Sequence, residues 1–332
     1  MKKSIAAAAA VAVLAAGGGI VYATGAFDSW RDGRALADAC GEMVDASQME
    51  RFLGADRVSG RSMGSLGCRA FDPGGKASLT VTVERGSSPD SVVLHAQQIL
   101  ARDQQSLLVP VGGGWPAMVS IGGGAESYAT ALLPCGEETS EDDLVLGMTA
   151  VRSGSGGGVQ ERREALAALV TRALERAAAA EGCESADRDK PHVRTGAFAD
   201  LQKSGEATGT CREAGLPSYE TEADGNAPIE QCVLAGDGGE RTFRLAAYYG
   251  PYPTAPRRDP LRGPYDYVGP SGTTESKSWT TASCAAGQAL YTMEALDPRT
   301  PASDQVRQAF RAFAAESATR HGCVAPLGVD QP

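Results

Sequence analysis

The spacing of apolar residues predicts two long helices of the same design. In residues 160–183 the apolar positions fall on one helical face. Residues 303–323 repeat the pattern in the same register, because Leu166 and Val306 each stand seventeen residues before a cysteine. Each helix is expected to end at a glycine, Gly182 or Gly322, because glycine readily adopts the left-handed conformation that stops a helix. The chain is therefore organised around one helix that is used twice.

Shorter patterns predict further elements. Residues 47–54 form an amphipathic helix, capped by Ser47 and ended by Gly54, and residues 89–105 form another. Apolar runs predict strands at residues 77–84, 128–133, 144–151, 242–248, 278–282 and 288–295, and a short strand between the glycine triplets 112–114 and 122–124. This order indicates an α+β fold in which helices pack on one face of a small antiparallel sheet.

The sequence also predicts two tandem repeats. Residues 24–27, Thr-Gly-Ala-Phe, return as residues 195–198, and each Thr lies sixteen residues before a cysteine. The remaining cysteines keep the same order in both halves, with shorter connections in the second. We therefore expect two disulfide-bonded α+β domains, residues 24–183 and 195–325, joined by a charged linker at 184–194.

Residues 1–23 have the features of an export signal. Lys2 and Lys3 precede residues 5–23, an apolar run without a single charge. Cleavage after Ala23 would release the protein, whereas an uncleaved run is just long enough to anchor it in the membrane, and the sequence leaves both outcomes open. Either way the rest of the chain is expected outside the cytoplasm, secreted or anchored to the cell membrane by residues 5–23.

Cysteine content and charge narrow the function classes. Eight cysteines in an exported chain are expected to form four disulfides. None has the close spacing of a metal-binding pair, so no metal or other cofactor is predicted. The net charge is −10, or −12 without Lys2 and Lys3, so we expect no general attraction to nucleic acid or anionic lipid. Contact with the membrane is expected only through the N-terminal segment.

Four short motifs carry a resemblance to a group of known proteins. They are Asp38-Ala39-Cys40, Met43-Val44, Phe52-Leu53-Gly54 and Gly67-Cys68-Arg69. This stretch, residues 38–85, resembles the opening of secreted or lipid-anchored actinobacterial envelope proteins of unknown function. The resemblance implies a small disulfide-bonded α+β domain and the pairing of Cys40 with Cys68, and it implies no activity. The chain departs from the group in lacking the lipid-attachment cysteine and in having two copies.

The four cysteines within each half could pair in three ways. We favour the set that would tie the opening of each domain to its first strand and its closing helix to a late strand. That set is Cys40 with Cys68, Cys135 with Cys183, Cys211 with Cys232, and Cys284 with Cys323.

Motifs of catalysis are few. Residues 60–64 match the Gly-x-Ser-x-Gly elbow of hydrolases around Ser62, with His95 or His321 as its partner, but no hydrophobic strand precedes them. Residues 112–117 match a loose dinucleotide loop, although Pro116 stands where its helix should begin. His192 lies in the linker, and the acidic cluster within residues 137–143 lacks the pattern of a calcium loop, so a solvated surface is expected there.

The loop of residues 250–272 is the best candidate for binding. Its six prolines argue against regular structure. It carries residue types that are enriched at binding surfaces: Tyr252, Arg257, Arg258, Arg262, Tyr265 and Tyr267. The preferred function is an exported, noncatalytic cell-envelope module that binds an envelope protein or a cell-wall ligand. The alternative is an exported serine hydrolase that uses Ser62.

Overall fold

A computed structural model describes residues 26–64, 67–85, 107–121, 126–135, 143–152, 158–183, 188–193, 200–258 and 267–328. The first half contains α2 (Ala26–Cys40), η1 (Gly41–Met43), α3 (Ala46–Leu53), β1 (Ser59–Ser62), β2 (Gly67–Phe71), β3 (Ala77–Arg85), β4 (Val109–Pro110), β5 (Ala117–Ile121), β6 (Glu126–Leu133), β7 (Leu144–Arg152) and α5 (Val159–Glu181). The second half contains η4 (Arg212–Ala214), β8 (Ser218–Glu220), β9 (Ile229–Ala235), β10 (Arg241–Tyr248), α6 (Thr254–Arg258), β11 (Ser271–Thr273), β12 (Lys277–Cys284), β13 (Gly287–Ala295) and α7 (Asp304–Arg320).

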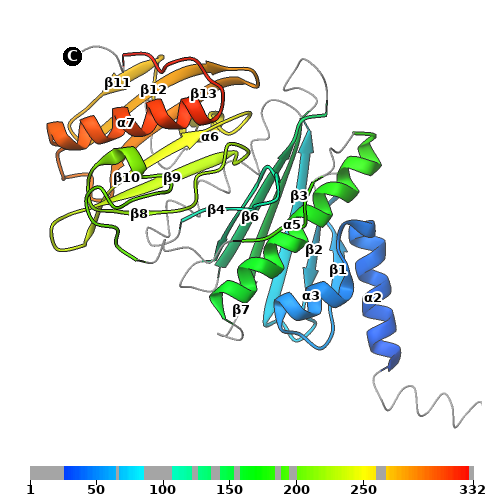
Figure 1. The fold of residues 1–332 in the computed structure, drawn as a ribbon. Helices are drawn as coiled ribbons and strands as arrows, with labels where there is room; N and C mark the ends of the chain where they lie inside the picture. The colour runs from blue at the N-terminus through cyan, green and yellow to red at the C-terminus, as the bar shows by residue number, and fades with distance from the viewer. Residues whose placement is uncertain are drawn as a thin grey trace, which may run out of the picture.

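Each half folds around its own antiparallel sheet (Figure 1). The strand order is β1-β2-β3-β7-β6-β5-β4 in the first sheet and β11-β12-β13-β10-β9-β8 in the second. Helix α5 packs on β5, β6 and β7, α7 packs on β10, β12 and β13, and α2 lies along β1 and β2. The prediction of an α+β fold with antiparallel sheets is confirmed.

The helix ends follow local signals in the sequence. Helix α5 ends at Gly182 with φ 71°, and the chain beyond α7 turns at Gly322 with φ 65°, so both predicted left-handed glycines are confirmed. The predicted cap of α3 is wrong. Asp45, and not Ser47, caps this helix, because its carboxylate accepts a hydrogen bond from the backbone N–H of Gln48 (3.0 Å).

The prediction that residues 250–272 are irregular throughout is also wrong. Within this loop, residues 254–258 form α6, and Pro256 is tolerated there because it lies in the first turn, where its missing N–H has no helical partner. Residues 271–273 form β11, which pairs with β12.

Several predicted segments lie outside the described residues. They are the N-terminal run 5–23, the helix 89–105, the triplet 122–124 and the motif at 195–198. Of the helices that are described, none is long and apolar enough to cross a membrane.

Each sheet has its own apolar core on the face that its helices cover. In the first half this core includes Met49 and Phe52 of α3, and in the second it includes Phe310 and Phe313 of α7. The four disulfides have the favoured pairing: Cys40 with Cys68, Cys135 with Cys183, Cys211 with Cys232, and Cys284 with Cys323. Four disulfides indicate an oxidising, extracytoplasmic environment.

A third apolar cluster joins the two sheets. The faces that point away from the helices pack against each other through Leu108, Met118, Tyr128, Leu132 and Val145 of the first half and Ala227, Ile229, Ala246, Tyr248, Tyr252 and Leu290 of the second. Two hydrogen bonds between described residues cross this interface. The Leu108 N–H donates to Gln231 Oε1 (3.0 Å), and the hydroxyls of Thr130 and Tyr252 lie 2.5 Å apart. Strands β6 and β9 are therefore buried on both faces along nearly their whole length.

The described part of the predicted linker, residues 188–193, is attached to the first sheet. The Gly112 N–H donates to the His192 carbonyl (2.9 Å), and the Asp189 N–H donates to the Gly113 carbonyl (3.1 Å). A Cβ on Gly112 would lie 2.5 Å from the His192 ring. The triplet 112–114 therefore makes room for this segment, and it leads into β5 instead of the helix of a dinucleotide loop.

Candidate functional site

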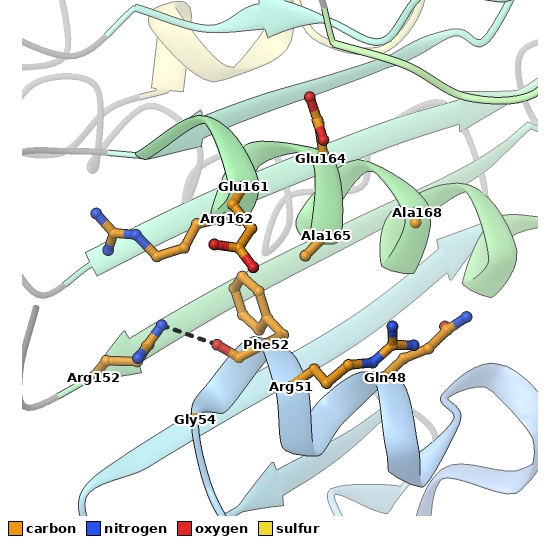
Figure 2. Close-up of a pocket in the computed structure, with 10 residues that line it drawn as sticks. All are labelled: Gln48, Arg51, Phe52, Gly54, Arg152, Glu161, Arg162, Glu164, Ala165 and Ala168. Atoms are coloured by element: carbon orange, nitrogen blue, oxygen red, sulfur yellow. Dashed lines mark hydrogen bonds between the residues drawn. The ribbon is translucent and has the colours of Figure 1, made fainter. Parts of the chain in front are cut away.

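The candidate site is a cleft of about 580 Å³ between α3 and the start of α5, called the α3–α5 cleft here (Figure 2). This volume lies in the usual range of small-molecule sites. Its lining comes from three elements that are distant in sequence: Gln48, Arg51, Phe52 and Gly54 at α3, Arg152 at the end of β7, and Glu161, Arg162, Glu164, Ala165 and Ala168 on α5.

Arg152 is held at one end of the cleft by the C-terminal end of α3. Its Nη1 donates a hydrogen bond to the Phe52 carbonyl (3.0 Å), one of the carbonyls that the last turn of the helix leaves without a helical partner. Gly54 follows with φ 65°, and a Cβ at this position would come within 2.9 Å of Arg152 Nη2. Gly54 therefore has two roles: its left-handed conformation ends α3, and its lack of a side chain leaves space for the Arg152 guanidinium.

Positive charge is concentrated beside Arg152. Burial lowers the pKa of Arg152, and the neighbouring charge of Arg162 lowers it further. The pKa of Arg163, which follows Arg162 in the chain, is lowered by the same two causes: burial first, and then the charge of Arg162, bring it to about 10. Arg162 Nε is buried and has no hydrogen-bond partner among the described residues. Arg152 and Arg162, the two of these residues that line the cleft, repel each other, so an anion bound between them would be stabilised.

The floor of the cleft is apolar, and its two acids differ in direction. Figure 2 shows the Phe52 ring between the two helices, below Ala165, with the Glu161 carboxylate pointing toward it. Glu164 points away, and its Oε1 accepts a hydrogen bond from Gln160 Nε2 (3.0 Å). The described lining contains no hydroxyl, thiol or imidazole. The arrangement is suited to holding a ligand that has an anionic group and an apolar part.

The described tyrosines of the loop at residues 250–272 are buried, although the composition of the loop suggests an exposed binding surface. Tyr252 and Tyr267 are buried, with 0% and 2% of their surface exposed, and Tyr252 belongs to the cluster that joins the sheets. Arg257 is partly buried, and its Nη2 lies 3.4 Å from Gln288 Oε1. For Arg258 no side-chain position is described, and Arg262 and Tyr265 lie outside the described residues. The two described tyrosines thus contribute to the core and not to an exposed surface.

Ser62 does not lie in a hydrolase-like setting. It ends the edge strand β1, and the next described element is β2 instead of a helix. Its hydroxyl accepts a hydrogen bond from the Gly64 N–H (3.2 Å). His321 belongs to the second half, where its ring stacks on Tyr249 (3.6 Å between centroids), and His95 lies outside the described residues. Across the described ranges, no group of three or more His, Cys, Asp or Glu side chains is placed to hold a metal ion.

Sequence reasoning missed a buried polar cluster in the second half. Glu230, on β9, is 1% exposed and accepts hydrogen bonds from Arg320 Nη1 (3.0 and 3.1 Å) and from the Ser317 hydroxyl (2.5 Å). His321 Nε2 lies 3.5 Å from the same carboxylate. The only signal in the sequence is an acid within the largely apolar strand IEQCVLA. Because its groups are buried and paired, the cluster is a structural element.

Compared with known proteins, the chain matches no family model and no curated sequence.

Proposed function

We propose that this chain is an exported, noncatalytic binding protein of the cell envelope. Its ligand is a small molecule with a carboxylate or phosphate group and an apolar part, and it binds in the α3–α5 cleft. The observation that supports this proposal most is the pair Arg152 and Arg162, which line the same cleft as the buried Phe52 in a protein whose overall charge is −10. The four disulfides support the extracytoplasmic location.

The proposal includes two copies of one domain, of which only the first has the cleft. The strand orders support duplication, because β1-β2-β3-β7-β6-β5 and β8-β9-β10-β13-β12-β11 follow the same path. Corresponding cysteines are 28 residues apart in the first half, Cys40 to Cys68, and 21 apart in the second, Cys211 to Cys232. In the first half α3 lies between these cysteines, and the second half has no described helix of its length there. An inserted α3 therefore explains a ligand site on one side only.

Binding of a matched set of eight-carbon compounds tests the ligand class. We expect octanoate and octyl phosphate to bind the intact protein in titration calorimetry, and octan-1-ol and octyltrimethylammonium to bind far more weakly, because only the first two are anions. Arg162→Gln should weaken anion binding by roughly tenfold or more, since a hydrogen bond to a charged group contributes about 1.5–3 kcal/mol.

The matched control is Arg34→Gln, which removes an arginine from the exposed surface of α2, where its side chain is 66% exposed. This variant should bind octanoate as the parent does. Equal loss in both variants, or equal binding of the alcohol and the carboxylate, would refute the cleft as an anion site.

A further inference from the structure

The N-terminal turns of α2 carry two aromatic side chains that the fold does not use. Phe27 is 45% exposed and Trp30 is 60% exposed, and their ring centroids are 6.0 Å apart. Every other Phe, Trp or Tyr side chain in the described part of the chain is buried or partly buried. An aromatic ring that stays exposed to water lacks the stabilisation that burial gives, about 25 cal/mol per Å² of apolar surface.

Their place in the sequence suggests what covers them. Residues 5–23 are apolar and uncharged, and Phe27 and Trp30 follow Ala23 by only four and seven residues. Aromatic residues that flank a membrane-spanning segment concentrate at the level of the lipid headgroups, where one edge of the ring is wet and the rest is apolar.

Helix α2 holds these rings rigidly on the first domain. Arg57 Nη1 lies 3.4 Å from Asp28 Oδ2 and 3.6 Å from Asp32 Oδ2, so the start of α2 is tied to the segment that enters β1. Helix α2 then packs along β1 and β2 (Figure 1). The rings therefore report where the domain itself lies, and not the position of a loose tail.

We propose that residues 5–23 stay uncleaved as a membrane anchor, and that Phe27 and Trp30 insert into the headgroup region of the same phospholipid bilayer. The membrane contact thus extends beyond the N-terminal segment into the folded domain. The cleft lies at the same end of the first sheet as the start of α2, as the pairing of the strands shows. Ser59, at the start of β1, pairs with Phe71, and Ala77, after the following turn, pairs with Arg152. The inference does not rest on the proposed ligand, because neither ring lines the cleft.

Tryptophan fluorescence of the full chain in phosphatidylcholine vesicles tests this contact. The chain has three tryptophans, and the other two, Trp115 and Trp279, are buried or partly buried. The emission that is lost in Trp30→Phe therefore belongs to Trp30. We expect lipids brominated near the headgroup to remove about half or more of this emission, and aqueous iodide to have little effect on it, as for an indole at the interface.

The control places a tryptophan on the second domain. Val268 is 61% exposed, so Val268→Trp in the Trp30→Phe background should be quenched by iodide and not by brominated lipid. The proposal is overturned if the Trp30 emission responds to iodide as strongly as this control does. It is equally overturned if neither quencher reaches Trp30, because a protein partner or a second copy would then cover it.

Discussion

Replacing Glu230 by Gln removes the charge at the centre of the buried cluster in the second half. The carboxylate accepts hydrogen bonds from Arg320 and Ser317 and faces His321. A glutamine has the same shape but only one acceptor oxygen, so a donor that now points at the second oxygen loses its partner. The change therefore tests the charge and the hydrogen bonds without opening a cavity.

The expected cost is about 3 kcal/mol in the free energy of unfolding, the lower end of the range for removing one partner of a buried ion pair. The lower end applies because Arg320 keeps a second partner. Its Nη2 lies 2.8 Å from Glu316 Oε1, so the guanidinium is not left buried and alone.

The pH dependence of this cost follows from the pKa of Glu230. Burial alone would raise the pKa, but the contact with His321, the charges of Arg320 and His321, and the hydrogen bond from Ser317 lower it below the ordinary value of 4.5. A carboxyl whose pKa is lower in the folded state stabilises the fold above its unfolded pKa. This contribution is lost as the pH falls through the folded value. The difference between parent and variant should therefore still be present above about pH 4.5 and shrink as the pH falls below it.

Urea unfolding followed by circular dichroism, with the disulfides intact, measures both effects. The control is Glu213→Gln, which breaks the exposed pair with Arg212 (3.3 Å) and should cost less than about 1 kcal/mol. A Glu230→Gln cost no larger than this control, or a difference that already disappears above pH 4.5, would show that the carboxylate does not act as a paired charge.

Three further changes test other parts of the structure. Tyr252→Phe removes the hydrogen bond with Thr130 between the sheets and should lower the unfolding free energy in urea by about 1 kcal/mol; no loss would mean that the hydroxyl is not paired. The double variant Cys135→Ser and Cys183→Ser opens a link between residues 48 apart and should cost about 4 kcal/mol by the chain-entropy model, measured in the same way, whereas a cost near zero would contradict that link. Ser62→Ala should change neither stability, within about 0.5 kcal/mol, nor any hydrolysis of a chromogenic ester; an esterase activity lost in this variant would favour the hydrolase alternative.

The elements that could be predicted from the sequence are those with one apolar face and one polar face. Helices α5 and α7 have one apolar face and a glycine just beyond the end, so their position and length follow from the sequence. Strand β3 alternates because only one of its faces is fully buried. The order of the cysteines alone leaves three pairings in each half. The observed set is the one that ties the opening of each half to its first strand and its closing helix to a late strand.

The packing of one sheet on the other could not be predicted in the same way. Strand β6 is buried at every position from Ser127 to Leu133, so it shows no polar face that would identify an interface. A strand buried on both sides has no alternation to read. For the same reason Tyr252 looked like a surface residue in a proline-rich loop, although its ring fills the space between the sheets.

The cleft was invisible to motif reasoning because its parts are short and distant in sequence. Arg152 ends a strand, Gly54 stops a helix and Arg162 lies in the first turns of another helix, so the three belong to no common motif. Their meeting depends on how α3 packs beside α5, which is a tertiary contact. A useful sequence signal is the conflict between the acidic total and the local run Arg162-Arg163, which the fold partly buries.

The two proposals impose one orientation on the molecule, and the arrangement of the sheets permits it. Helix α2 lies at the β1 edge of the first sheet, whereas the second sheet is joined to the first through residues near β4, β5, β6 and β7. The first half can therefore meet a bilayer with Phe27 and Trp30 while the second half packs against the other end of the first sheet. A cleft at that end would open near the headgroups, where carboxylates and phosphates with apolar chains are abundant.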